Sequence, residues 1–325
     1  MRRRNGFGPL LLVALSLSGA ARADAQTATQ STVRGRPAAD TAALLHDLRT
    51  LAADSMEGRQ TGSTGAERAR RYLESRLATI GVEPAGAAGF RSPFRFAACR
   101  DSAGRGGVNL IARVSGRDAG RIIVVTAHYD HVGIRNGQVF NGADDNASGV
   151  AALLAVARSL AADPPRHTVV LAALDAEETG LRGAHAFVDS PPVSRDDIAI
   201  NLNFDMVGRN AAGELWVAGT HHYPFLAPFV EELAGRSRIT LKAGHDRPDL
   251  GPGQDWTGSS DHAAFHAARI PFLYFGVEDH ADYHRPTDDA ERIDAAFFTA
   301  AVETLVDAVR SLDRELERLV PVRSR

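Results

Sequence analysis

The stretch at residues 121–130 reads RIIVVTAHYD, a run of apolar and β-branched residues that ends in polar ones. Two later stretches have the same form, HTVVLAALDAEE at 167–178 and IAINLNFD at 198–205. Strands that are apolar on both faces lie in sheets that are covered on both sides. Apolar residues at helical spacing fill the intervals at 148–162 and 181–188. The sequence therefore predicts an α/β fold with a mixed, largely parallel central sheet and helices on both faces.

The same periodicities extend this fold in both directions along the chain. Upstream they predict helices at 42–53 and 66–80 and a strand at 108–114. Downstream they predict strands at 214–218 and 272–275, a helix at 224–233, a helix that opens at residue 260 and a closing helix at 295–319. Together these elements predict a single catalytic domain over residues 40–320.

The first 39 residues differ from the rest in composition. Three arginines at residues 2–4 precede an apolar run at 9–20 and a string of small residues that ends at Ala25. This order is typical of a secretory signal peptide, which we expect over residues 1–25, followed by a flexible leader at 26–39. The apolar run is shorter than the roughly 20 residues that span a bilayer. We therefore expect an exported protein, periplasmic or secreted, with no membrane span after cleavage.

Charge and cysteine content narrow the possible partners. Removing the four Arg and one Asp of residues 1–25 from the 37 basic and 40 acidic residues leaves 33 and 39, a net charge of −6. This acidic balance argues against nucleic acid as a partner. Cys99 is the only cysteine and cannot form a disulfide within the chain, so we interpret it as a buried apolar residue.

Polar side chains follow the three apolar runs where each strand is predicted to end. They are His128 and Asp130 after the first run, Glu177 and Glu178 after the second, and Asp205 after the third. Ligands of open α/β sheets bind beyond the carboxyl ends of the strands, so these side chains are expected to share one edge.

Two loops add further candidates, Asp145 within NGADDNASG at 141–149 and His284 within DYHRP at 282–286. Imidazole and carboxylate without thiolate suit zinc or a similar divalent ion in a hydrolytic site. Five ligands are too many for one catalytic zinc with an open position. They suit two ions that are bridged by one carboxylate.

Six strings in fixed order, HYDHVG, GADDNASG, AEETGLRGAHAF, NFDMVGR, SDHAAF and DYHRPTD, resemble the M28 family of zinc aminopeptidases and carboxypeptidases. The stretch LAADSMEGR at 51–59 also resembles that family, and the likeness covers residues 45–315. It implies the zinc-exopeptidase fold, also seen in phosphorylase/hydrolase-like proteins, and two Zn²⁺ ions as cofactors. It further implies that Asp145 bridges the metals, that His128 and Asp205 are terminal ligands of different metals, and that Glu178 and His284 complete the set.

The resemblance also assigns roles to the neighbours of these ligands. Glu177 matches the general base. Neighbouring side chains of extended backbone point in opposite directions, which suits one glutamate on the metal and one on the water. Asp130 is expected to orient the second imidazole nitrogen of His128. The peptide after the bridging aspartate, Asp145–Asn146, is expected to be cis, and Asp144 is interpreted as a turn residue.

The remaining polar residues are given structural roles. His262 is predicted at a helix start capped by Ser260 or Asp261. Asp288 is expected either to support His284 or to cap the last helix. The other histidines of these motifs and loops are interpreted as structural or rim residues, namely His131, His221, His222, His266 and His280. Many members of the family carry a Tyr before the SDH string, which this chain lacks, so Tyr129, Tyr274 and Tyr283 are the candidates for a phenol that stabilises the oxyanion.

These features predict an exported co-catalytic two-zinc exopeptidase that acts on peptides, in the first place an aminopeptidase. A carboxypeptidase or dipeptidase of the same family stays open, since such relatives share the ligand types. A single-zinc glutaminyl cyclase is the alternative from another class, and the complete ligand set for two metals argues against it. A receptor-like relative would have lost Glu177 or several ligands. A serine hydrolase lacks support because we find no G-x-S-x-G motif.

Overall fold

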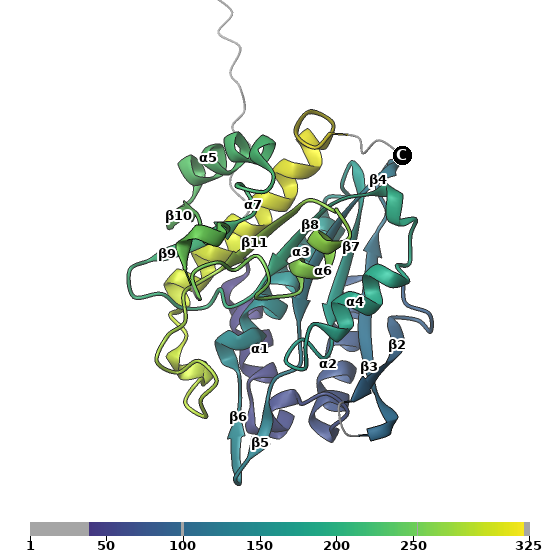
Figure 1. Ribbon diagram of the computed structural model, residues 1–325, viewed down its shortest axis with the longest axis vertical. Helices are drawn as coiled ribbons and strands as arrows, with labels where there is room; N and C mark the ends of the chain where they lie inside the picture. Colours follow the sequence, from purple (N-terminus) through teal and green to yellow (C-terminus); the bar gives the residue numbers. More distant parts are fainter. Residues whose placement is uncertain (1–38, 99–100, 252, 322–325) are drawn as a thin grey trace, which may run out of the picture. The chain divides into compact units, whose positions relative to one another are not determined.

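The three apolar runs form neighbouring parallel strands at the centre of the fold (Figure 1). They are β4 (Asp118–His128), β7 (His167–Leu174) and β8 (Ile198–Phe204), and β4 lies between the other two. The register pairs His128 with Leu174 across β4 and β7, and Thr126 with Asn203 across β4 and β8. The computed structural model describes residues 39–98, 101–251 and 253–321.

Helices and further strands surround this centre. The helices are α1 (Thr41–Leu51), α2 (Thr64–Ile80), α3 (Gly149–Ala162), α4 (Arg182–Asp189), α5 (Ala227–Arg236), α6 (His262–Ala267) and α7 (Ala295–Leu319). The other strands are β1 (Glu83–Pro84), β2 (Arg91–Ala98), β3 (Asp101–Val114), β5 (Gly133–Arg135), β6 (Gln138–Phe140), β9 (Glu214–Ala218), β10 (Thr240–Ala243) and β11 (Phe272–Gly276). In the described residues, β5 and β6 form a separate hairpin and the other strands form one sheet in the order β1-β3-β7-β4-β8-β11-β9-β10, with β2 also paired to β3.

The sheet is mixed, as the sequence predicts. Strands β7, β4, β8 and β11 are parallel to one another, and β10 is parallel to β9. Antiparallel pairing joins β3 to β7 and β11 to β9. The expected fold class, with helices on both faces, is confirmed.

Alternate residues of the central strands enter two separate cores. Ile123 and Val125 of β4 belong to a core that also contains residues of α1, α2, α3, α5 and α7. Ile122 and Val124 belong to a core with residues of α4 and α6. The apolar side chains on both faces of each strand are thus buried under helices, which explains why these runs show no polar alternation.

The predicted elements agree with the observed ones except at the edges of the sheet and in the separate β5–β6 hairpin. The hairpin of β2 and β3 begins well before the predicted strand at 108–114, and β10 and the β5–β6 hairpin are absent from the prediction. Edge strands are half exposed and polar, and β2 contains Pro93, so their apolar signal is weak.

The predicted signal peptide and nearly all of the leader lie outside the described residues, as does Cys99. The described residues all lie within one structural unit. Within the described residues, none of the helices combines the length and the apolarity that crossing a bilayer requires.

Candidate active site

The carboxyl ends of β4, β7 and β8 bring the predicted side chains to one edge of the sheet. His128 is the last residue of β4, and Asp205 directly follows β8. Nε2 of His128 lies 3.2 Å from Oδ1 of Asp205 and 3.4 Å from Oδ1 of Asp145. All three side chains are buried. The resemblance assigned His128 and Asp205 to different metals, and this assignment is wrong here, because both residues lie in one group of possible ligands with Asp145.

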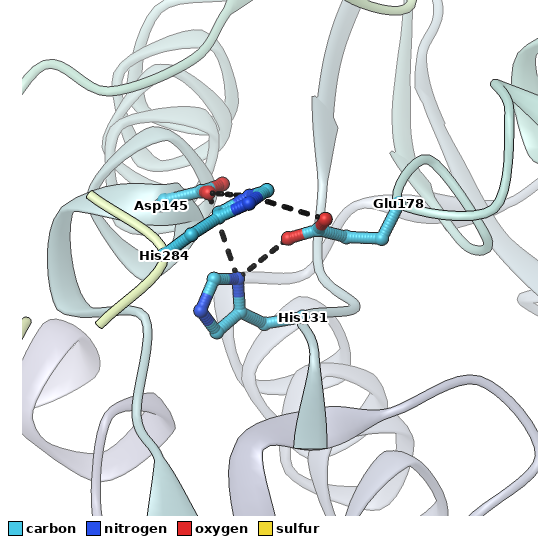
Figure 2. A group of neighbouring side chains, drawn as sticks. All are labelled: His131, Asp145, Glu178 and His284. Carbon is cyan, nitrogen blue, oxygen red and sulfur yellow. Dashed lines mark ion pairs between the residues drawn. The ribbon is translucent and has the colours of Figure 1, made fainter. Parts of the chain in front are cut away.

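The second oxygen of Asp145 faces a different group of side chains, drawn in Figure 2. Oδ2 lies 3.0 Å from Nε2 of His284 and 3.6 Å from Nδ1 of His131. Glu178 completes this group, with Oε1 at 2.7 Å from Nδ1 of His131 and Oε2 at 3.2 Å from Nε2 of His284. Asp145 therefore lies between two groups and offers one oxygen to each.

His131 is a correction to the sequence analysis, which placed it among structural or rim residues. It is fully buried and lies inside the second group. Its position three residues after His128, directly beyond a strand end, is the signal that could have identified it.

The chemistry of these groups suits divalent metal ions. Each group offers three or more nitrogen and oxygen atoms within 4.8 Å of one another. In the part of the chain that the structure describes, both ring nitrogens of His131 and Oε1 of Glu178 are buried without a hydrogen bond. Buried polar atoms are costly unless they are satisfied, and metal ligation satisfies a nitrogen and a carboxylate oxygen at once.

Asp145 is held by a loop that turns sharply before α3. Its peptide bond to Asn146 is cis, as the resemblance implies. The side chain of Asn146 donates to the main-chain oxygen of Phe204 and accepts from the main-chain nitrogen of Gly149. These contacts tie the loop of Asp145 to the end of β8 and so to Asp205.

Asp288 also positions this loop. Its carboxylate accepts hydrogen bonds from the main-chain nitrogens of Asp144 and Asp145, all at 3.1 Å. Burial, together with the neighbouring charge of Asp144, raises the pKa of Asp288 to about 6. Neither expected role is right, since the carboxylate is engaged by the Asp145 loop and Asp294 caps α7 instead.

Asp144 is more than a turn residue. Its carboxylate accepts from the main-chain nitrogen of Gly208 at 2.6 Å and lies 3.1 Å from Nε2 of His280. It thereby joins the loop of Asp145 to the segment after Asp205. The sequence interpretation missed this because Asp144 and its two partners lie far apart along the chain.

Arg59 lies beneath the site and is fully buried. Its guanidinium donates to the main-chain oxygens of Leu51, Tyr129, Asn141 and Gly142. Burial lowers its pKa to about 10 against the opposing effect of Asp145 and Asp288. Because it binds the segment after His128 and the loop before Asp145 together, this residue of the LAADSMEGR stretch positions both.

Glu177 lies on the turn between β7 and α4, beside Glu178 but outside both ligand groups. The main-chain nitrogen of Glu177 donates to Oδ1 of Asp130 at 3.0 Å. Burial raises the pKa of the Glu177 carboxyl well above its usual range, His128 opposes this, and Asp205 adds to it. The turn thus separates the two glutamates, with Glu178 in a ligand group and Glu177 outside both groups.

Asp130 has a wider role than orienting His128. Nδ1 of His128 lies 3.1 Å from the main-chain oxygen of Asp130 and 3.7 Å from its carboxylate. The carboxylate accepts from the main chain of Glu177 and, at 3.3 Å, from the hydroxyl of Thr61. Asp130 therefore joins the end of β4 to the turn that carries Glu177.

The segment before α6 supports Asp205. His262 begins α6, as expected, but neither Ser260 nor Asp261 caps the helix with its side chain. The hydroxyl of Ser260 instead donates to Oδ2 of Asp205 at 2.7 Å. Nε2 of His262 lies 2.8 Å from the main-chain oxygen of Trp256, away from both ligand groups.

The three candidate phenols differ in position. The hydroxyl of Tyr129 is buried among Val108, Arg70 and Asp175, which it contacts at 2.8 to 3.0 Å. That of Tyr274 donates to the main-chain oxygen of Asp205 at 3.3 Å. Tyr283 is half-buried and stacks on the ring of His284, with ring centroids 4.0 Å apart.

Known proteins that resemble this chain in sequence include an aminopeptidase. The chain is 32% identical to Aminopeptidase YwaD of Bacillus subtilis over 205 residues, which are 58% of this chain and 40% of that protein. It is 29% identical to Leupeptin-inactivating enzyme 1 of Streptomyces exfoliatus over 284 residues, 86% of this chain and 58% of that protein. The chain therefore spans about half the length of these relatives.

Solved structures share the fold at lower identity. A zinc aminopeptidase from Bacillus subtilis superposes with a TM-score of 0.69 at 18% identity, over 86% of this chain and 96% of that one. A glutaminyl cyclase from Bacteroides thetaiotaomicron superposes with a TM-score of 0.64 at 18% identity, over 85% and 99%. The family model "Peptidase family M28" matches residues 109–309, which is more than half of the sequence. The chain therefore belongs to peptidase family M28.

Proposed function

We propose that this protein is an exported aminopeptidase that uses two zinc ions to remove N-terminal residues from peptides. The observation that supports the proposal most directly concerns the carboxylate of Asp145. Its two oxygens face two separate groups of nitrogen and oxygen atoms. His128 and Asp205 would hold one ion with Asp145, and Glu178 and His284 would hold the other with it. Bound zinc would supply Lewis-acid polarisation of the scissile carbonyl and lower the pKa of water.

The protein's own residues supply the proton transfer. Glu177 lies beside the two groups without belonging to either, which leaves its carboxylate available to take a proton from the attacking water. The same carboxyl can then return that proton to the leaving amine nitrogen. Asp130 holds the main chain of Glu177 and also lies against His128, so base and ligand keep a fixed relation.

The names of the relatives favour an aminopeptidase. Aminopeptidase YwaD and Leucine aminopeptidase 2 of Trichophyton equinum are both aminopeptidases by name, at 32% identity over 205 and 181 residues. The glutaminyl cyclase likeness concerns the fold alone. Two complete ligand groups support two ions, whereas a single-zinc cyclase needs one.

The experiment that tests this function combines metal and product analysis on one sample of the purified protein. We expect close to two zinc ions per chain by elemental analysis, and release of the N-terminal residue from a peptide with a free amine but not from its N-acetylated twin. Release of the C-terminal residue from both peptides would show a carboxypeptidase. One ion with loss of ammonia from an N-terminal glutamine peptide would show a cyclase.

Export is supported by the composition of residues 1–25. Expression of the full chain in a bacterial host, followed by N-terminal sequencing of the product outside the cytoplasm, tests it. A mature protein that starts after Ala25 is expected, whereas an uncut chain in the cytoplasm would contradict export.

A further inference from the structure

We propose that His131 is a fourth protein ligand in the group of Asp145, Glu178 and His284, so that this metal site is closed by protein atoms while the site of His128 and Asp205 stays open. This inference rests on the proposed two-metal function. It assigns the open coordination positions, and with them the binding of water and substrate, to the ion beside Asp205.

The distances in the group match one coordination sphere. Zinc bonds to nitrogen and oxygen of about 2.1 Å in a tetrahedron place the ligand atoms about 3.4 Å apart. Nδ1 of His131 lies 2.7 Å from Glu178 and 3.6 Å from Asp145, and Nε2 of His284 lies 3.0 and 3.2 Å from the same two carboxylates. Figure 2 shows Nδ1 of His131 turned toward the space between the two carboxylates, with the ring of His284 across it.

The contact between His131 and Glu178 is close without being a hydrogen bond. Nδ1 and Oε1 are 2.7 Å apart, yet neither atom has a hydrogen bond among the described residues, because the ring N–H direction does not point at that oxygen. A ring that only supported Glu178 would be expected to point at it. This arrangement is expected when Nδ1 of His131 and Oε1 of Glu178 both point at a metal ion between them.

The ring nitrogens of His131 support the same conclusion. Both are buried, and neither has a hydrogen-bond partner in the described part of the chain. Buried polar atoms are costly unless they are satisfied, and ligation of a metal ion by Nδ1 would satisfy one of the two.

The ring of His131 is also held in place. A Cβ atom on Gly142 would lie 2.5 Å from Cδ2 of this ring, so the backbone of Gly142 packs directly against it. Gly142 has a φ of +55°, and its main-chain oxygen is bound by Arg59. The loop that carries Asp145 thus fixes the histidine beside it, as a preorganised ligand requires.

The two sites then differ in their number of protein ligands. The first has His128, Asp145 and Asp205, and the second has His131, Asp145, Glu178 and His284. Catalytic zinc sites keep an open position and structural sites are closed by four protein ligands. We therefore expect the four-ligand site to fill first and to release its metal last.

Two isosteric variants separate ligation from hydrogen bonding. The amide of His131→Asn reaches the position of Nδ1 and can donate to Glu178, but it is a poor zinc ligand. The carboxylate of His131→Asp reaches the same position and can ligate zinc, but it repels Glu178 when no metal is present. Metal-free protein is titrated with Zn²⁺ against a chromophoric chelator, and with Co²⁺ by visible absorption.

Ligation predicts that wild type binds two ions and that His131→Asn weakens one of them by more than about 100-fold, beyond the 10–100-fold effect of a residue that only supports a ligand. It also predicts that His131→Asp restores most of this affinity and that the Co²⁺ spectrum of the tighter site changes in both variants. His185→Asn, an exposed change on α4, is the control and should match wild type. If His131→Asn binds as wild type does, or more tightly than His131→Asp, the inference is wrong.

Thermal unfolding of the metal-free variants excludes a folding defect as the cause. Ligation predicts midpoints near that of metal-free wild type and a smaller increase on adding zinc. Lower midpoints without metal, with an unchanged increase on adding zinc, would overturn the ligand role of His131. A wild type that binds fewer than two ions would instead overturn the two-metal function itself.

Discussion

Two clusters of histidine and carboxylate lie at opposite ends of the same parallel strands. One is the active-site cluster described above, beyond the carboxyl ends of β4, β7 and β8. The other, the opposite-end cluster, consists of Asp118 and His167 at the beginnings of β4 and β7, with Asp313 and Glu317 of α7. Asp118, His167 and Glu317 could also hold a metal ion by composition and spacing. The two clusters differ in how far the protein itself satisfies their polar atoms.

The opposite-end cluster is complete without a metal. Nδ1 of His167 lies 2.9 Å from the main-chain oxygen of Asp313, and Nε2 lies 3.2 Å from Glu317. The carboxylate of Asp313 accepts from the main-chain nitrogens of Arg166 and His167. Arg121 donates to Glu317 and supplies positive charge. In this cluster the contacts of His167 join α7 to the start of β7.

The active-site cluster has the opposite character. Buried atoms of His131 and Glu178 have no hydrogen bond in the described residues, and Asp145 is shared between two groups. The comparison teaches that residue types and spacing do not distinguish a metal site from a structural one. Unsatisfied buried ligand atoms do.

The largest expected effect separates the two neighbouring glutamates of the active-site cluster. Glu177→Gln keeps the shape of the side chain but removes the base, so kcat should fall by roughly 10² to 10⁴. Metal content should stay near that of wild type. Glu178→Gln should instead lose metal, because an amide is a poorer zinc ligand than a carboxylate. Steady-state kinetics and elemental analysis of both variants check this, and near-normal turnover in Glu177→Gln would contradict its role.

Removal of metal should affect only one of the two clusters. A ligand present at about 1,000 times its Kd stabilises the folded state by about 4 kcal/mol, so a chelator should abolish activity and lower stability by this order for each site. His167→Ala should retain the full increase in folding stability that bound metal gives. Denaturant unfolding with and without chelator measures both. A smaller increment in His167→Ala would mean that the opposite-end cluster also binds metal.

The opposite-end cluster should contribute to stability alone. His167→Ala removes a buried ring that contacts the main-chain oxygen of Asp313 and Oε1 of Glu317, at a cost of about 1–3 kcal/mol. His167→Asn should cost less, since its amide can still donate to Asp313. Both variants should keep the zinc content of wild type. Equal losses in the two variants would show that packing, rather than the hydrogen bond, sets the cost.

The smallest effect concerns the pH dependence of the chelated protein. Contacts with Asp145 and Glu178 raise the pKa of His284 from 6.5 to about 10. Burial acts to raise the pKa of Glu178, but His131 and His284 outweigh it and lower this pKa from 4.5 to about 2. The contribution of His284 to the free energy of unfolding is therefore complete below pH 6.5, and it is lost as the pH rises toward 10. That of Glu178 is complete above pH 4.5 and lost as the pH falls toward 2.

Thermal unfolding in the presence of chelator checks this dependence. We expect the midpoint to decline from pH 6.5 toward 10, and His284→Asn to remove part of the decline. The zinc-loaded protein should show the reverse trend near neutral pH, because metal binding displaces protons from its ligands. A decline of equal size in His284→Asn would assign the effect to other groups.

The sequence by itself determined the fold class and the chemical types at the site. Short apolar, β-branched runs without polar alternation favour strands covered on both faces, and the residues that end parallel strands of this kind meet at one edge. His128, Glu177, Glu178 and Asp205 follow from this rule, since each ends a central strand or lies within four residues of its end. The rule is local, so a single sequence suffices to apply it.

Only the tertiary structure decided how these residues are grouped. His128 joins Asp205, His131 enters the second group, Asp288 holds the Asp145 loop and Arg59 binds two loops from beneath. Each of these contacts joins parts of the chain that lie far apart in sequence. The direction of a side chain on a loop depends on every element that packs against it. Strand periodicity fixes which edge a residue reaches, and the packing of the loops fixes which atoms it faces there.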